Sequence, residues 1–294
     1  MKRRNFLKAA APFLFLPAAR TQPPPKQAEI RSSVMLWTLP GTLEEKLEQA
    51  ARAGIQSVEL SGEHLAWDRP ELERFRRLAQ SFRLGIDSIT AIPYQQMDEF
   101  SMVNPGHREA MLAEVKRNIE RARRLECPAI LLLTGRRVEG LAREAQWNSL
   151  VEACRRCGDL AEEAGLQAVV EPLNDKVETP GYFLTTVKEG VKLMREAAHP
   201  RLGLVFDIYH EQVQTGNIID TIREAADYTR IYHVADCPGR HEPGTGELNY
   251  PNIYKAIGKT GFRGHIAMEF EPTKDPVATL IAAVDEMREA LAAS

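Results

Sequence analysis

The chain has no excess of basic residues and no apolar run long enough to cross a bilayer. Its 294 residues carry 38 Lys and Arg against 41 Asp and Glu, and the pI is about 6.2. A nucleic-acid-binding domain needs a basic face, and a membrane-spanning helix needs about 20 predominantly apolar residues. We therefore expect neither a nucleic-acid partner nor a spanning segment.

Cysteines and nucleotide-binding glycine motifs are also scarce. The four cysteines are Cys127, Cys154, Cys157 and Cys237. Cys154 and Cys157 form a CxxC pair inside a helical pattern, but no second pair completes a zinc site, so packing in a helix is favoured over redox or metal chemistry. No GxGxxG opens a helix, and nothing in the sequence supports dinucleotide binding.

The N-terminus has the pattern of an export signal. Basic residues 2–4 precede a short apolar run at 9–19, as in a signal peptide. The pair Arg3-Arg4, followed by Phe6-Leu7-Lys8, resembles a twin-arginine signal. We assign residues 1–19 to this signal and the Pro-rich residues 20–29 to a linker. We expect a periplasmic or exported protein with no stable membrane association after the signal is removed.

Apolar, β-branched runs alternate with amphipathic stretches over residues 30–294. This alternation predicts parallel strands connected by helices, and eight strands is the number that a single-domain (β/α)8 TIM barrel needs. A doubly wound open sheet is the alternative. The expected strands are 33–37, 57–60, 86–90, 129–134, 167–171, 202–207, 230–235 and 265–270. The expected helices are 43–53, 71–83, 107–125, 144–164, 183–197, 217–228, 250–259 and 276–291.

Four side chains of metal-ligand type close four successive expected strands: Glu171, Asp207, His233 and Glu269. They lie 36, 26 and 36 residues apart, which suits one strand plus one helix each. Such residues would meet at the mouth of a barrel, where the sites of this fold lie. Three carboxylates and one imidazole favour Mn²⁺ or Mg²⁺ over Co²⁺ or Zn²⁺.

The same set predicts proton-transfer chemistry. A metal polarises a substrate carbonyl, and two carboxylates across a substrate can take a proton from carbon and return it. Glu171 and Glu269 are the candidates for this pair, and the reaction would be isomerisation or epimerisation of a small keto acid or sugar through an enediolate. Candidates for substrate contacts are His64, His210, Arg240 and His241; candidates for pocket walls, with core packing as the commoner role, are Trp37, Trp67, Tyr94 and Phe100.

Four sequence strings closely resemble hydroxypyruvate isomerases, which belong to the xylose isomerase-like TIM barrels together with ketose 3-epimerases. The strings are EPLN at 171–174, FDIYH at 206–210, PGRHEPGTGELNYP at 238–251 and EFEP at 269–272. The resemblance implies a divalent metal held by Glu171, Asp207, His233 and Glu269, with the two glutamates as acid and base. It also implies that His210 and Arg240 contact substrate, and it is compatible with a homo-oligomer.

Two positions depart from the isomerase pattern. His233 stands where hydroxypyruvate isomerases often have Gln, and Glu271 stands where they commonly have a basic residue. A ketose 3-epimerase or another sugar isomerase of the superfamily is therefore the main alternative. A three-zinc endonuclease-type barrel and a non-catalytic sugar-binding protein are two further alternatives.

Overall fold

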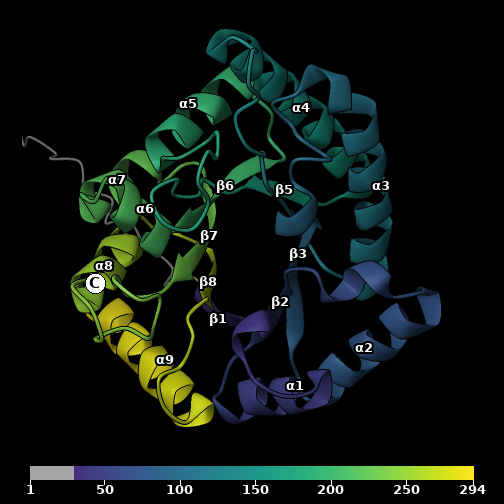
Figure 1. Ribbon diagram of the computed structural model, residues 1–294. Coiled ribbons are helices and arrows are strands. Elements are labelled where there is room, and N and C mark those ends of the chain that lie inside the picture. The colour runs from purple at the N-terminus through teal and green to yellow at the C-terminus, as the bar shows by residue number, and fades with distance from the viewer. Residues whose placement is uncertain (1–29) are drawn as a thin grey trace, which may run out of the picture.

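The structure, a computed structural model, describes residues 30–294 as one closed barrel. Eight strands run in chain order, each parallel to the next, and β1 pairs with β8 to close the ring. The main helices form an outer ring around the strands (Figure 1). The prediction of a (β/α)8 barrel is confirmed, and the open sheet is excluded. The expected signal peptide and linker lie outside the described residues.

The strands are β1 (Ile30–Met35), β2 (Ser57–Leu60), β3 (Gly85–Ile92), β4 (Ala129–Leu132), β5 (Gln167–Val170), β6 (Leu202–Asp207), β7 (Thr229–Val234) and β8 (Gly264–Met268). The helices are α1 (Leu43–Arg52), α2 (Arg69–Ser81), α3 (Arg108–Leu125), α4 (Arg143–Ala164), α5 (Val187–Ala197), α6 (Ile208–Gln214), α7 (Ile218–Ala225), α8 (Tyr250–Lys259) and α9 (Pro276–Ala292). All eight predicted strands and all eight predicted helices are present, with ends displaced by up to four residues. Helix α6 was not predicted. Among residues 30–294, no helix is both long and apolar enough to cross a membrane.

Local sequence signals fix several helix ends. Thr42 and Glu45 form a capping box at the start of α1, because each side chain bonds the other's backbone N–H. Asp68 and Glu71 do the same for α2. Gly165 ends α4 with φ +74°, a left-handed conformation that glycine adopts without steric cost. These ends return the chain to the barrel after each helix.

The barrel interior contains a group of buried polar side chains, here called the polar column: Ser33, Glu59, Asp87 and Ser88. The carboxylates of Glu59 and Asp87 are buried side by side, accepting hydrogen bonds from the hydroxyls of Ser88 (2.8 Å) and Ser33 (2.6 Å). Burial, with the charge of Glu59, raises the pKa of Asp87 well above its usual value and favours its protonated form. TIM barrel interiors are dominated by branched apolar residues, so this column calls for a functional explanation.

The four cysteines are buried and none is in a disulfide. Cys154 and Cys157 both lie on α4, and Sγ of Cys157 is 3.8 Å from Sδ of Met111. Burial raises the pKa of the Cys154 thiol well above its usual value and that of Cys157 to about 12. The CxxC pair therefore packs in the helix layer, as predicted.

Candidate metal centre

Strand register brings the four predicted ligands together at the carboxyl ends of β5 to β8. Asp207 ends β6 and pairs directly with His233 of β7. Glu171 follows the last residue of β5, and its backbone N–H donates to the carbonyl of Leu132. Glu269 follows β8 in the same way, donating to Val234. The four side chains therefore stand on adjacent strands at one edge of the barrel.

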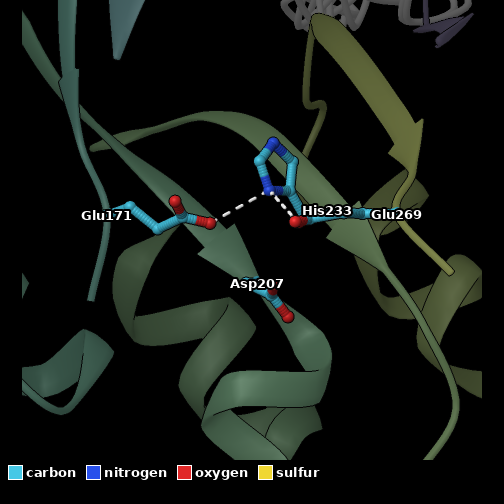
Figure 2. Close-up of side chains that lie close together, drawn as sticks. All are labelled: Glu171, Asp207, His233 and Glu269. Carbon is cyan, nitrogen blue, oxygen red and sulfur yellow. Dashed lines mark ion pairs between the residues drawn. The ribbon is translucent and has the colours of Figure 1, made fainter. Parts of the chain in front are cut away.

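One ligand atom from each of these residues lies within 4.8 Å of those from the other three. Glu171 and Glu269 point toward one another from opposite sides, with the imidazole of His233 between them and Asp207 beside them (Figure 2). Two oxygen ligands on opposite sides of one small divalent ion lie about 4 Å apart. All four residues are buried, and buried charges of one sign are stable only when paired or metal-bound. The cluster has the composition and spacing of a divalent-metal site.

His233 presents its two ring nitrogens to different partners. Nδ1 faces the cluster, 3.0 Å from Oε1 of Glu171 and 2.8 Å from Oε2 of Glu269. Nε2 lies 3.2 Å from Oε2 of Glu59. A metal-bound histidine donates its second ring N–H to a carboxylate in this manner. Nδ1 of His233 and Oε2 of Glu269 are buried without a hydrogen bond of acceptable geometry, as expected for two atoms directed at a common ion.

The four ligand side chains differ in protonation behaviour. Burial, together with the charge of Glu269, raises the pKa of Asp207 to about 8. Burial also raises the pKa of Glu171, although His233 opposes it. Burial acts in the same direction on Glu269, but the charges of Arg240 and His233 outweigh it and hold that pKa below its usual range. The two glutamates are thus shifted in opposite directions, which is a hallmark of paired acid and base groups.

The pKa of His233 is raised well above its usual value. Burial acts to lower it, but the surrounding charges of Glu59, Glu171 and Glu269 have the larger combined effect. Without a metal, the imidazole therefore favours its protonated form. A divalent ion would take the place of that proton at Nδ1, because a ligating imidazole must be neutral.

A cavity of about 440 Å³ opens beside the four ligands. Ligand pockets of about 300–1,000 Å³ hold small molecules. Glu171 and Glu269 form part of its wall, and the predicted contact residues His210 and Arg240 also line it. Thr90 of β3 also lines the cavity, and further lining side chains come from the segments after the strands: Trp37, Tyr94, Glu178 and Thr179. The cavity suits a substrate of a few carbon atoms.

The environment of His210 fixes its tautomer. The backbone N–H of Asn174 lies 3.1 Å from Nδ1, and Nδ2 of the same residue lies 2.8 Å from it. A backbone amide can only donate, so Nδ1 of His210 carries no proton. Burial, with the charge of Arg240, holds the pKa of His210 well below its usual value. The neutral ring therefore carries its proton on Nε2, 3.7 Å from Oδ2 of Asp207, where it can donate to a substrate oxygen.

Arg240 places a guanidinium beside the ligand cluster. Its Nη2 lies 2.6 Å from Oε1 of Glu269 and 3.6 Å from Oδ2 of Asp207. The guanidinium also lies 5.4 Å from the ring centroids of Trp37 and Tyr209, within the range of cation–π attraction. These contacts hold the group at the wall of the cavity.

Two of the predicted contact residues lie elsewhere. His64 is fully buried but is not among the cavity-lining residues, and its burial and the charge of Arg121 lower its pKa to about 4. His241 lies outside the cavity lining as well, with Nδ1 2.8 Å from the carbonyl of Glu271. Of the wall candidates, Trp37 and Tyr94 line the cavity, while Trp67 packs against Phe75 with the two rings tilted and Phe100 packs in the core.

Two acidic residues of the site received no role from the sequence. Glu59 of β2 lies 3.2 Å from Nε2 of His233. Its position near the end of an expected strand was the only sequence feature that could have indicated a role. Glu178, in the loop after β5, accepts a hydrogen bond from the Tyr209 hydroxyl at 2.7 Å and lies 4.0 Å from Nη1 of Arg240. No motif marks Glu178, because a loop with little regular structure brings it to the cavity.

Comparison with known proteins agrees with this architecture. The family model described as Xylose isomerase-like TIM barrel matches residues 47–291. A human protein named "Putative hydroxypyruvate isomerase" is 30% identical over 264 residues, covering 86% of this chain and 94% of that protein. Hydroxypyruvate isomerase of Escherichia coli is 28% identical over 229 residues, covering 77% and 87%.

Solved structures share the fold at lower identity. D-psicose 3-epimerase from Clostridium cellulolyticum H10, solved with D-tagatose, superposes with a TM-score of 0.72. The match covers 90% of this chain and 96% of that one at 20% sequence identity. This likeness shows a common barrel.

Proposed function

Because this chain belongs to the hydroxypyruvate isomerase-like members of the xylose isomerase-like TIM barrel family, we propose that it interconverts a small hydroxycarbonyl compound with the help of a divalent metal. The observation that carries the proposal is the pair of buried carboxylates, Glu171 and Glu269, facing each other at the cavity within one cluster of metal-ligand atoms. Hydroxypyruvate, the compound named in both relatives, is the first substrate to test.

The proposed metal ligands are Glu171, Asp207, His233 and Glu269. Carboxylate-rich sets of this kind favour Mn²⁺ or Mg²⁺, with Co²⁺ and Zn²⁺ as the other choices. When bound, the ion supplies Lewis-acid polarisation of the substrate carbonyl, which acidifies the adjacent C–H.

The chain's own residues would move the proton. One carboxylate of the Glu171–Glu269 pair removes a proton from the carbon beside the carbonyl, and an enediolate forms. A proton is then returned to the former carbonyl carbon from the carboxylic acid so produced or from its partner, while the hydroxyl proton passes to the oxygen that was the carbonyl. His210 donates from Nε2 to a substrate oxygen, and Arg240 holds a carboxylate or hydroxyl group of the substrate.

The decisive experiment follows solvent deuterium into hydroxypyruvate by NMR. The Mg²⁺-loaded protein is compared with Glu171→Gln and Glu269→Gln, and bound metal is measured in each variant because both residues are also proposed ligands. Glu289→Gln is the matched control, since this exposed side chain on α9 lies outside the cavity lining. We expect deuterium incorporation by the wild type and the control and at least a roughly 100-fold loss in both site variants. Exchange that persists in both variants would refute the proposal.

A ketose 3-epimerase is the second candidate, and the facing geometry of the carboxylates favours it. Epimerisation removes a proton from one face of a carbon and adds one to the other, so it uses two groups on opposite sides of the substrate. Glu171 and Glu269 approach from opposite sides (Figure 2). Incubation with D-tagatose in D₂O distinguishes the two reactions, because deuterium at C3 with epimer formation identifies the epimerase and an inert ketose favours the keto acid isomerase.

The nuclease alternative lacks support in this structure. A three-zinc site needs further histidine ligands beside the main cluster, but residues 30–294 contain a single group of side chains with metal-binding spacing. The formal net charge of −3 also opposes binding to a phosphate backbone.

A further inference from the structure

The loop after β7, residues 236–248, is folded around one buried carboxylate. Asp236 is fully buried, and its Oδ1 accepts hydrogen bonds from the backbone N–H groups of Cys237 (2.8 Å) and Leu248 (3.1 Å). Its Oδ2 accepts a third from Gly244 (2.8 Å). Within residues 30–294 this carboxylate forms no ion pair, so backbone amides from three points of the loop stabilise its charge.

The backbone of Asp236 is tied to the same loop. Its N–H donates to the carbonyl of His241 at 2.7 Å, and its carbonyl accepts from the N–H of Arg240 at 3.1 Å. These bonds close a tight turn between β7 and Arg240. The turn is also bonded to the loop that follows β8, because the carbonyl of Arg240 accepts from the N–H of Glu271 at 3.0 Å.

Arg240 itself has an unfavourable backbone conformation. Its φ of +56° lies in the left-handed region, which is uncommon for residues other than glycine. Such conformations persist where the surrounding structure determines them, and they cluster at functional sites. The contacts from Asp236 and Glu271 supply that constraint.

A glycine shows how closely the loop is fitted to the carboxylate. A Cβ at Gly246 would lie 2.2 Å from the carbonyl oxygen of Cys237 and 2.6 Å from Oδ1 of Asp236. Both distances are far below van der Waals contact, so residue 246 must be glycine for the backbone to pass this close to the carboxylate. The carboxylate is therefore an internal support for the loop.

We propose that Asp236 is a positioning residue, whose carboxylate folds loop 236–248 so that the guanidinium of Arg240 is held at the cavity wall beside Glu269. This role rests on the proposed function of the site, since Arg240 is its point of contact with substrate. The guanidinium of Arg240 lies between Trp37, Tyr209 and the ligand carboxylates. The turn that places it there depends on the hydrogen bonds of Asp236.

The test is a double-mutant cycle on kcat/KM with hydroxypyruvate and the Mg²⁺-loaded protein. Asp236→Asn keeps the shape of the side chain but replaces one acceptor oxygen with an NH₂ group that cannot accept from a backbone N–H. We expect this variant to lose roughly 100-fold in kcat/KM, mainly through KM, because displacement of a substrate-positioning group by about 1 Å has effects of this size. In an Arg240→Ala background the same change should cost less than about 3-fold, because the group it positions is gone.

Asp68→Asn is the matched control. This aspartate also accepts a backbone N–H, from Glu71 at the start of α2, but it lies outside the cavity. We expect it to leave kcat/KM unchanged. Equal losses from Asp236→Asn with and without Arg240 would overturn the proposal, because they would indicate a general structural role.

A second readout does not depend on catalysis. The Nε–H group of Arg240 is buried without a hydrogen-bond partner, so we expect a resolved signal for it in ¹H–¹⁵N spectra of the wild type. In Asp236→Asn this signal should merge with those of exposed arginines, while Asp68→Asn leaves it in place. If the wild type proves inactive on every substrate tested, the spectra still decide whether Asp236 positions Arg240. Failure of the proposed function can therefore be distinguished from failure of the positioning role.

Gly246→Ala provides a second perturbation if Asp236→Asn does not fold. It retains the carboxylate but displaces it by steric contact, and it should reproduce the loss in KM and the shift of the Arg240 signal. Circular dichroism and metal content verify that each variant is folded and loaded. If neither variant folds, Asp236 is required for the fold itself and the positioning role is refuted.

Discussion

Replacing Glu59 with glutamine should weaken metal binding without changing any of the four proposed metal ligands. Oε2 of Glu59 lies 3.2 Å from Nε2 of His233 and both side chains are fully buried. A carboxylate in this position orients the ring and increases its basicity, and its loss typically reduces metal affinity 10- to 100-fold, or about 1.4–2.8 kcal/mol. The amide introduced by Glu59→Gln can still accept one hydrogen bond from the ring, but it carries no charge.

The same change has a calculable effect on thermal stability. Metal at 100 times its Kd stabilises the wild type by about 2.7 kcal/mol, and a Kd raised 10- to 100-fold reduces this to about 1.4–0.4 kcal/mol. For a domain of this size, 1 kcal/mol corresponds to roughly 2–4 °C in Tm. The metal-dependent rise in Tm should therefore shrink by about 3–9 °C in Glu59→Gln.

The assay is calorimetric titration of chelator-stripped protein with Mn²⁺, paired with thermal melts at one fixed metal concentration. Asp87→Asn is the control, because Asp87 belongs to the same polar column but favours its neutral form. An amide in its place alters little of the charge around His233. An unchanged Kd in Glu59→Gln, or an equal loss in both variants, would refute the view that Glu59 acts through His233.

Three further predictions concern the site and the fold. Mn²⁺ affinity should rise between pH 6 and 8, and binding at pH 7 should release about one to two protons. The reason is that Asp207, with its pKa of about 8, and His233, with its raised pKa, must both lose a proton. Titration in buffers of different ionisation enthalpy measures the release, and a flat affinity between pH 6 and 8 contradicts it. Asn174→Ala should raise KM roughly 10-fold and leave the Mn²⁺ affinity unchanged. The change removes a donor to His210 and the acceptor of the Val177 and Glu178 N–H groups. Steady-state kinetics measure KM, and calorimetry measures the Mn²⁺ affinity. Thr42→Ala should lower the free energy of unfolding by about 1 kcal/mol through loss of the α1 capping box, and a melt indistinguishable from that of wild type would count against this cap.

The sequence was most informative where a pattern repeats along the chain. Alternating apolar runs predicted every strand, because parallel barrel strands are buried on both faces and share one composition. The four metal-ligand candidates were identifiable because each lies at an equivalent point of a repeating unit. Their convergence depends only on barrel topology, which the repeat itself implies.

The parts that the sequence did not predict depend on distant or irregular contacts. Glu59 and His233 are 174 positions apart and meet only because the barrel closes. Helix α6 was missed because its seven residues are too few for a clear period, although Asp207, whose side chain accepts the N–H of His210, is a good N-cap. Helix α5 begins at Val187, four residues later than predicted, because Tyr182 and Phe183 are buried in the preceding loop, where the Tyr182 hydroxyl donates to the carbonyl of Glu171.

The burial of Cys127, Cys154 and Cys157 shields these three thiols from redox reagents while the chain is folded. A thiol reacts as its thiolate and only where reagents reach it, and Cys127, Cys154 and Cys157 are enclosed in the core. These three thiols can thus stay reduced in a reducing or an oxidising compartment. The same enclosure turns these thiols into reporters of opening, because alkylating reagents should label them only at the rate at which the barrel unfolds.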